Sequence, residues 1–218
     1  GENSDGEGNI LMRQLIQSGG PVMYPLILCS VIVVTVTIER LWFFLSQRAD
    51  LEDVKRVVLR LLEKEAPLDA IQYLQRINHP VTRMLQSGMI YFGKERDVLE
   101  RNLKEAGEME IKRMERGLGL LDVVVTASPL LGLLGTVNGI IQSFNIFSAA
   151  QGLPSATALG QGIAEALLTT AAGLMIAIPS LFIIHWLNSM IERRVQQMNL
   201  FSKDFLDNYG NRGVSDDV

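Results

Sequence analysis

The feature that most limits the possible folds is the long stretch 118–187, which is almost free of charge. Between Arg116 and Glu192 the only formally charged residues are Asp122 and Glu165. The apolar run is broken once, at residues 149–155, and each half is longer than the roughly 20 residues that a helix needs to cross a bilayer. The sequence therefore predicts two membrane-spanning helices joined by a short loop.

Glu165 lies inside the second of these predicted spans. An ionisable side chain near the centre of a span costs about 2.5–3.5 kcal/mol on insertion scales, so such a group usually faces protein or water and serves a function. We therefore take Glu165 as the first candidate functional residue. A structural alternative stays open, in which a protonated Glu165 only hydrogen-bonds a neighbouring helix.

A third apolar segment lies near the N-terminus. Residues 22–45 carry no charge except Glu39 and Arg40, and their length suits one tilted span. Trp42 and Phe43 fall where an aromatic belt would lie at the membrane surface. We expect Arg40, close to the end of this span, to extend its long side chain to the lipid headgroups.

Residues 46–116 have a different character, because charged and apolar residues alternate at helical spacing. Residues 50–65 place their apolar side chains on one face, as an amphipathic helix does. Pro67 and Pro80 each open a further predicted helix, since proline is tolerated in the first helical turn. A fourth helical pattern begins near Glu95 and runs without proline into the second span. This region predicts a helical domain in water.

The distribution of basic residues predicts the orientation in the membrane. Of the 20 Lys and Arg residues, 15 fall within 40–116 and 4 follow the third span, while only Arg13 precedes the first span and 149–155 has none. Cytoplasmic segments near spans carry the excess of Lys and Arg. The middle domain and the C-terminus are therefore expected in the cytoplasm and the N-terminus outside.

The predicted fold is thus an all-α integral membrane protein with three transmembrane helices, from which long helices extend into a cytoplasmic helical domain. Its predicted parts are an outer tail with a short amphipathic helix (1–20), the first span (21–45), the cytoplasmic helical domain (46–116), the second span (117–148), an outer loop (149–155), the third span (156–187) and a cytoplasmic tail (188–218).

Composition excludes several classes of function. The net charge of −4 offers no basic surface for nucleic acid. The single cysteine, Cys29, allows no internal disulfide and no zinc cluster, and no cofactor is expected. An intramembrane hydrolase would need paired aspartates, a serine with a base or a metal motif such as HExxH, and the sequence has none of these. We therefore predict that the protein is not an enzyme.

Small residues recur at helical spacing in the second and third spans. Such residues let membrane helices approach closely, because packing rather than water exclusion holds helices together in lipid. The second span has this pattern at Gly132, Thr136, Gly139 and Ser143, and the third has it at Gly162, Ala166, Thr169, Gly173 and Ala177.

Two threonines accompany the buried acid at neighbouring depths. Counted from the outer loop at about 1.5 Å per residue, Thr136 lies roughly 18 Å deep, Thr170 about 22 Å and Glu165 about 15 Å. A carboxyl group with hydroxyls nearby can relay a proton or hydrogen-bond an acid of a partner. A threonine by itself more often bonds its own helix carbonyl, so this structural alternative remains for each threonine.

Other residues of the two spans are given structural roles. Pro129 and Pro179 are expected to interrupt their helices and leave carbonyl groups free. Asp122 lies near the cytoplasmic end of the second span, where it is expected to form an ion pair with Arg116 or with a base of another subunit.

Four segments resemble one known family. The strings GGPVMYPLILCS, TIERLWFF, SPLLGLLGTVNGIIQSF and GIAEALLTTAAGLMIAIP are similar to the ExbB and TolQ branch of the ExbB/TolQ/MotA proton-channel proteins. The resemblance extends from about Ile10 to Trp186 and is nearer to ExbB than to TolQ. MotA-type flagellar stators have four spans, whereas three are predicted here.

The resemblance implies a pentamer in the bacterial cytoplasmic membrane, with a periplasmic N-terminus and a pore lined by the second and third spans. It also implies an ExbD-like partner with one span that carries a proton-binding Asp, and work on a TonB-like protein. Glu165 matches the family's third-span glutamate, and Thr136 and Thr170 match its threonines. Here the glutamate is followed by LLTT rather than LLAT, so that Thr169 adds a hydroxyl whose role is open.

Overall fold

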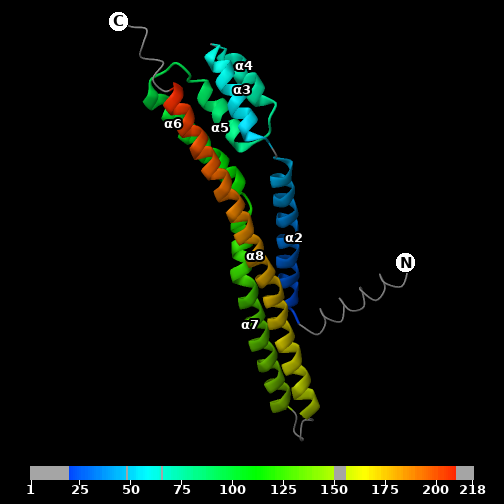
Figure 1. Ribbon diagram of the computed structural model, residues 1–218. Helices are drawn as coiled ribbons and strands as arrows, with labels where there is room; N and C mark the ends of the chain where they lie inside the picture. The colour runs from blue at the N-terminus through cyan, green and yellow to red at the C-terminus, as the bar shows by residue number, and fades with distance from the viewer. Residues whose placement is uncertain (1–19, 48, 65, 150–155, 210–218) are drawn as a thin grey trace, which may run out of the picture. The chain divides into compact units, whose positions relative to one another are not determined.

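The structure is a computed structural model that describes residues 20–47, 49–64, 66–149 and 156–209 (Figure 1). The predicted all-α fold is confirmed for these residues, which form helices and no strand. The predicted amphipathic helix of 1–20 and most of the predicted loop lie outside the described residues. The helices are α2 (Met23–Ser46), α3 (Leu51–Glu63), α4 (Pro67–Gln75), α5 (Pro80–Met89), α6 (Arg96–Glu115), α7 (Leu118–Ala149) and α8 (Ala156–Tyr209).

Three of these helices are long and apolar enough to cross a membrane, as the sequence predicts. The candidate spans are Met23–Ser46 in α2, Leu118–Asn145 in α7 and Gly162–Tyr209 in α8. At about 1.5 Å per residue, even the shortest of them covers roughly 36 Å, more than the roughly 30 Å of a hydrocarbon core.

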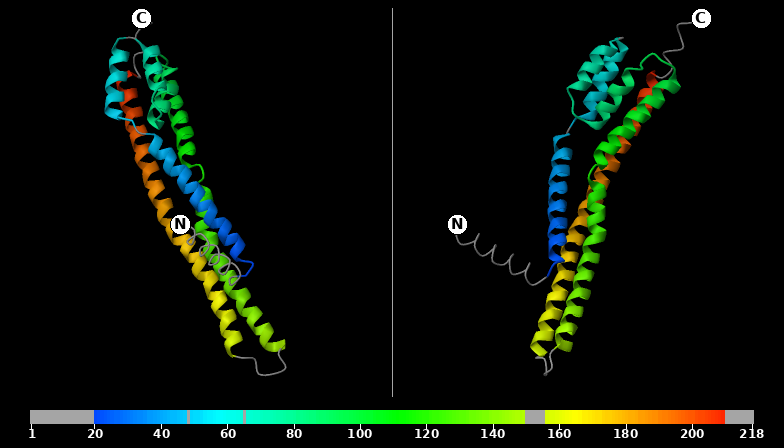
Figure 2. Two further views of the ribbon diagram at one scale, coloured as in Figure 1. Left: turned by 90° about the vertical axis from the view of Figure 1, so that its right-hand side faces the viewer. Right: turned by 180° about the vertical axis from the view of Figure 1, so that it is seen from behind.

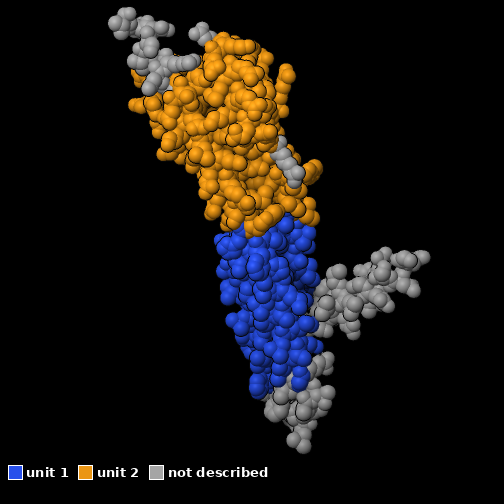
Figure 3. Space-filling view, viewed as in Figure 1, with its two compact units in different colours: residues 1–37, 117–185 blue, residues 38–116, 186–218 orange. Residues whose placement is uncertain are grey.

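The chain divides into two compact units, which Figure 3 shows in different colours. Unit 1 combines 1–37 with 117–185, and unit 2 combines 38–116 with 186–218. Helices α2 and α8 each contribute residues to both units.

Unit 1 is built on a helical hairpin. Its α7 and the first part of α8 run side by side in opposite directions, and α2 begins part of the way along them (Figure 2). The start of α2 is anchored by Val22, Met23 and Leu26, which pack against Leu131, Ala172 and Ile176. Large apolar side chains cover the outer surface of α7, among them Leu130, Leu133, Val137, Ile141 and Phe144. Such a surface suits lipid or a neighbouring membrane helix.

Unit 2 contains α3 to α6 and the end of α8. The start of α3 is capped by Asp50, whose carboxylate accepts hydrogen bonds from the backbone N–H groups of Glu52 and Asp53. Pro67 and Pro80 each occupy a first turn, as the sequence predicts. Phe92 from the loop after α5 packs against Phe205 and Tyr209 near the end of α8.

One prediction about the helices is wrong. The pattern that begins near Glu95 does not continue as one helix into the second span, because α6 ends at Glu115 and α7 begins at Leu118. Between them Arg116 is extended and Gly117 has a φ of 83°. Glycine adopts this left-handed conformation without the clash that a Cβ would cause, so it ends the helix where no proline is present.

Helices α7 and α8 continue through Pro129 and Pro179, so the predicted interruption is not seen. That each proline leaves a carbonyl group of its helix without a backbone donor stays a prediction. Helix α8 also continues past residue 187 to Tyr209, so most of the predicted tail is helical. In this last part Ile191, Met198 and Phe205 are buried at helical spacing, which explains why the helix persists outside the apolar stretch.

Candidate functional site

Three threonine hydroxyls meet at the contact between α7 and α8. The Oγ1 atoms of Thr136 and Thr170 are hydrogen-bonded to each other across the two helices. Thr136 Oγ1 also lies 3.1 Å from the carbonyl oxygen of Ala166, and Thr170 Oγ1 lies 3.0 Å from that of Gly132. Thr169 Oγ1 lies 2.7 Å from the Ala166 oxygen and 3.3 Å from the Gly132 oxygen. The structure thus brings together the hydroxyls that the helical rise placed at similar depths.

The protons of this cluster have more than one possible arrangement. The carbonyl oxygen of Gly132 lies within hydrogen-bond distance of all three threonine hydroxyls. A carbonyl oxygen has two lone pairs, and each hydroxyl has one proton to donate. At least one threonine must therefore donate elsewhere, to another hydroxyl or to the Ala166 oxygen. Interchange between such arrangements is what a proton relay requires.

The small residues chosen from the sequence lie where the two helices touch. A Cβ added to Gly132 would lie 2.9 Å from the carbonyl oxygen of Thr169, and one added to Gly173 would lie 2.4 Å from that of Ser128. Gly135, which sequence reasoning missed, has the same property, since its Cβ would lie 2.3 Å from Thr169 Oγ1. Gly139 and Gly162 are also in close contact across the hairpin, with Ala166 and Ser143 respectively.

Glu165 is half-buried and lines a small cavity of about 50 Å³ in unit 1. The cavity is also lined by Asn138 and Gln142 of α7 and by residues 20–22, where α2 begins. Glu165 precedes Thr169 by one helical turn, so the acid lies about 6 Å further along α8 toward the hairpin loop. The acid and the threonines therefore form consecutive levels of the same helix contact.

Asn138 and Gln142 are the polar residues of this site that sequence reasoning missed. A search for charged residues passes over them, because carboxamides are neutral. Their spacing was the available signal: Gly135, Asn138, Gly139 and Gln142 follow at helical steps of 3, 1 and 3 and share one side of α7.

Asp122 and Arg116 are both exposed. Arg116 is the last residue of the segment 38–116 in unit 2. Asp122 belongs to unit 1, and its backbone carbonyl accepts a hydrogen bond from the hydroxyl of Thr126. Their pairing stays a prediction.

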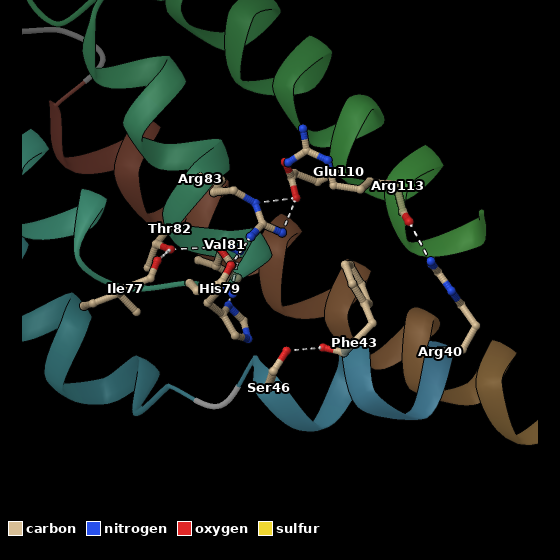
Figure 4. A network of polar contacts seen from close by, with 11 residues as sticks. Arg40, Phe43, Ser46, Ile77, His79, Val81, Thr82, Arg83, Glu110 and Arg113 are labelled. Atoms are coloured by element: carbon tan, nitrogen blue, oxygen red, sulfur yellow. Dashed lines mark hydrogen bonds and ion pairs between the residues drawn. The ribbon is translucent and has the colours of Figure 1, made fainter. Parts of the chain in front are cut away.

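Unit 2 holds a buried ionic network around Glu110 (Figure 4). The Glu110 side chain is 7% exposed, and its Oε2 accepts from Nε and Nη2 of Arg83 at 2.8 and 2.6 Å. Its Oε1 accepts from Nη1 of Arg113 at 2.8 Å. A buried carboxylate needs this degree of pairing, because an unpaired buried charge is strongly destabilising. The network joins α5 to α6.

Arg40 does not reach the headgroups, and this prediction is wrong. Its side chain is 3% exposed and donates from Nη1 to the carbonyl oxygens of Arg113 and Met114, at 3.1 and 3.4 Å (Figure 4). It also pairs with Glu39 at 2.6 Å and lies over the ring of Phe43. The last carbonyls of a helix lack partners within it, and a cation there is favoured by the helix dipole. Arg40 therefore caps the end of α6.

His79 caps the start of α5 in its neutral form. Its Nδ1 accepts from the backbone N–H of Val81 at 3.2 Å, and the residue is 3% exposed. Burial, followed by the charges of Arg194 and Arg83, lowers the pKa of His79 to about 4.

Among the described residues, no three His, Cys, Asp or Glu side chains gather in a way that could hold a metal ion.

Comparison with known proteins bears on this site. A family described as the MotA/TolQ/ExbB proton channel family matches residues 76–200, a segment that contains α7 and the threonine cluster. The chain is 35% identical over 187 residues to a biopolymer transport protein named ExbB-like 1 from Synechocystis, covering 84% of this chain and 72% of that protein. It is 32% identical over 176 residues to the biopolymer transport protein exbB1 of Vibrio cholerae, covering 78% of this chain and 75% of that one.

A more distant similarity is to TolQ. The Tol-Pal system protein TolQ of Pseudomonas aeruginosa is 35% identical over 105 residues, which is 48% of this chain and 45% of that protein. The two ExbB-like relatives named above therefore match far more of the chain than this TolQ does. With Glu165 and three threonines meeting in a helical hairpin inside the matched segment, the chain belongs to the MotA/TolQ/ExbB proton channel family.

Proposed function

We propose that this chain is an ExbB-like subunit of a proton-driven complex in the bacterial inner membrane. In this proposal the complex uses the proton motive force to energise a TonB-like protein for outer-membrane transport. The observation that carries the proposal is the order of polar side chains along the contact between α7 and α8. Glu165 comes first, and the hydroxyls of Thr169, Thr170 and Thr136 follow about one helical turn further on. The ExbB-like relatives, which match most of the chain, support the same assignment.

The family consists of proton channels, which are transport proteins and not enzymes. Three candidate spans make this chain a multi-pass membrane protein. The steps to be explained are therefore the binding and passage of protons.

Within this proposal Glu165 takes up and releases the proton, and the threonine hydroxyls carry it further. A hydroxyl can accept one proton while it donates another, so hydrogen-bonded hydroxyls can pass a proton along. The hydroxyls of Thr136 and Thr170 make this connection from one helix to the other. Gly132 and Gly173 support the relay by letting the helices approach closely enough for that bond.

The relay within one chain is incomplete, which is why the proposal includes partners. Between Arg116 and Glu192 the only acids are Asp122 and Glu165. One charge that crosses 100 mV releases about 2.3 kcal/mol, and this energy drives motion only if the path couples charge to conformation. We propose that five copies of the chain surround a dimer of an ExbD-like single-span protein, whose transmembrane Asp residues complete the path.

The proposed orientation places the N-terminus in the periplasm and the C-terminus in the cytoplasm. It is supported by the Lys and Arg residues, most of which lie within 40–116. The exposed apolar surface of α7 supports a location in lipid or against a neighbouring subunit.

A second candidate is a TolQ-like subunit of an envelope-maintenance motor of the Tol-Pal type. The similarity to TolQ favours it, although that similarity covers 48% of the chain. Complementation of strains that lack ExbB or TolQ separates the two candidates, and we expect rescue of ExbB-dependent uptake.

The proposed function is tested by proton flux into liposomes that contain this chain with an ExbD-like single-span protein. We expect flux under an applied potential, and its loss in Glu165→Gln, with the oligomer unchanged in size-exclusion chromatography. Gln keeps the size and a hydrogen-bonding end but has no proton to release. If Glu165→Gln conducts and supports uptake as well as the unmodified chain, Glu165 is structural and the protein is a membrane scaffold.

A further inference from the structure

We propose that the cavity beside Glu165 is a water site through which protons reach this acid, and that Asn138 and Gln142 are the positioning residues that hold the water. The water site rests on the cavity and its lining, and its role in proton access rests on the function proposed above. This role is specific to the lining residues of α7 and is separate from the threonine cluster.

The size of the cavity matches water. Its volume is about 50 Å³, counted as the space open to the centre of a water molecule. About 10–15 Å³ of such space is enough for one water, so the cavity has room for a small cluster of water molecules.

The lining of the cavity supplies the partners that such water needs. A buried water makes about three hydrogen bonds. Asn138 and Gln142 each offer an amide oxygen as acceptor and an NH₂ group as donor, and Glu165 adds carboxyl oxygens from the other helix. The two carboxamides are one helical turn apart and therefore lie on the same side of α7.

The close contact of the helices explains why the polar groups line a hollow. Between the carboxamides lies Gly139, and Gly135 precedes them by one turn. Neither glycine has a side chain to fill the space, and a Cβ on Gly139 would lie 2.7 Å from that of Ala166. The helices touch at this point, and the longer side chains border the contact.

The presence of two carboxamide side chains in an apolar span also requires a physical explanation. Both are exposed in the single chain, on a helix whose other exposed residues at this level include Val137 and Ile141. An amide that meets hydrocarbon without a hydrogen bond costs about 2–7 kcal/mol. Bound water removes this cost for both residues.

The position of the cavity connects it to the outer water. It is bordered by residues 20–22, at the very start of the first span. The threonine cluster lies one turn from Glu165 in the opposite direction along α8. Water, acid and hydroxyls thus follow one another in the order that an inward proton path requires.

The water is tested by X-ray radiolytic labelling of the full chain in lipid nanodiscs, which marks side chains next to bound water. Val22 borders the cavity and is 8% exposed, so it is the reporter. The variant is Asn138→Leu with Gln142→Leu, which keeps the approximate volume and removes the amides. Its matched control is Asn145→Leu, because Asn145 is an exposed carboxamide on the same helix outside the cavity lining.

We expect labelling of Val22 in the unmodified chain and in Asn145→Leu, and its loss in the double leucine variant. Proton flux in liposomes that also contain the ExbD-like partner should fall about tenfold in that variant. A tenfold change is what the loss of one hydrogen bond to a charged group produces. Asn138→Gln with Gln142→Asn, which retains both amides, should recover most of the labelling and the flux.

Each other outcome overturns the proposal. If Val22 is unlabelled in the unmodified chain, or equally labelled in the double leucine variant, the amides hold no water. If labelling is lost while flux persists, the water is not on the proton path. The labelling needs neither a partner nor conduction, so a conducting Glu165→Gln variant would refute the proposed function without deciding whether water is bound.

Discussion

The carbonyl oxygen of Gly132 lies within hydrogen-bond distance of all three threonine hydroxyls of the candidate site. It lies 3.0 Å from Thr170 Oγ1 and 3.3 Å from the hydroxyls of both Thr136 and Thr169. This convergence is possible only because Gly132 has no Cβ, since a methyl group there would lie 2.9 Å from the backbone of α8. At the residue scale, the chemistry of the threonines therefore depends on glycine.

Gly173 gives the sharpest test of this close approach. In Gly173→Ala the new Cβ would meet the carbonyl oxygen of Ser128 at 2.4 Å, and a backbone atom cannot rotate away. We expect a loss of about 1–3 kcal/mol in stability, typical of overpacking, seen as a lower midpoint of thermal unfolding in detergent. Gly162→Ala is the matched control, because its nearest neighbour is the Ser143 hydroxyl, which can change rotamer. Equal midpoints for the two variants would contradict this account.

His79 should make the stability of unit 2 depend on pH. Its pKa is about 4 in the folded protein, below the ordinary value of 6.5. As the pH falls from 6.5 toward 4, the unfolded chain takes up a proton that the folded chain does not. The free energy of unfolding therefore falls, by up to about 3 kcal/mol near pH 4, and is regained as the pH rises.

The variant His79→Asn isolates this effect. Asn can cap α5 with its side-chain oxygen but does not titrate in this range. We expect the free energy of unfolding in urea to change less between pH 4.5 and 7.5 in His79→Asn than in the unmodified chain. If the free energy of unfolding depends on pH as steeply in His79→Asn as in the unmodified chain, His79 is not the group that causes this dependence.

At the scale of the elements, the junction of α6 and α7 depends on one residue. Gly117 has a φ of 83°, and a Cβ there would lie 3.2 Å from Cγ1 of Val36. Gly117→Ala should destabilise the protein by about 1–2 kcal/mol, the usual cost of a left-handed conformation in a residue with a Cβ.

Gly119 provides the control for this junction. It lies two residues further on, within α7, and has open space where its Cβ would be. Gly119→Ala should be neutral or stabilising by up to about 1 kcal/mol, because alanine is the better helix former. The unfolding midpoints of the two variants, measured by circular dichroism in detergent, check this expectation. An unchanged midpoint in Gly117→Ala would show that the junction between α6 and α7 does not require glycine.

The elements also show which features the sequence could predict. Helices and candidate spans were predictable from periodicity, proline positions and hydropathy. The level shared by Thr136 and Thr170 followed from the constant rise of a helix. The break between α6 and α7 at Gly117 could not be predicted, because an isolated glycine is also tolerated within helices. Arg40 was misplaced because its partners, the carbonyls at the end of α6, are distant in sequence.

At the scale of the whole molecule, the orientation in the membrane can be measured. We expect a membrane-impermeant maleimide, added to intact spheroplasts, to label Asn145→Cys and not Gln72→Cys, in each case with Cys29→Ala. Both positions are exposed, but Asn145 lies near the loop end of α7 and Gln72 lies on α4 of unit 2. Labelling of Gln72→Cys in spheroplasts that leave a cytoplasmic control protein unlabelled would contradict the proposed orientation.

The start of α2 beside Glu165 has a consequence for the electrical profile of the protein. If the apolar run from Met23 onward crosses the low-dielectric slab by itself, the tip of the hairpin beyond residues 142 and 165 stands clear of that slab. Glu165 then sits at a small electrical distance from the outer solution. In the function and orientation proposed above, most of the voltage drop then falls between this carboxyl group and the cytoplasmic face, so the force on a travelling proton is exerted chiefly after it has left the acid.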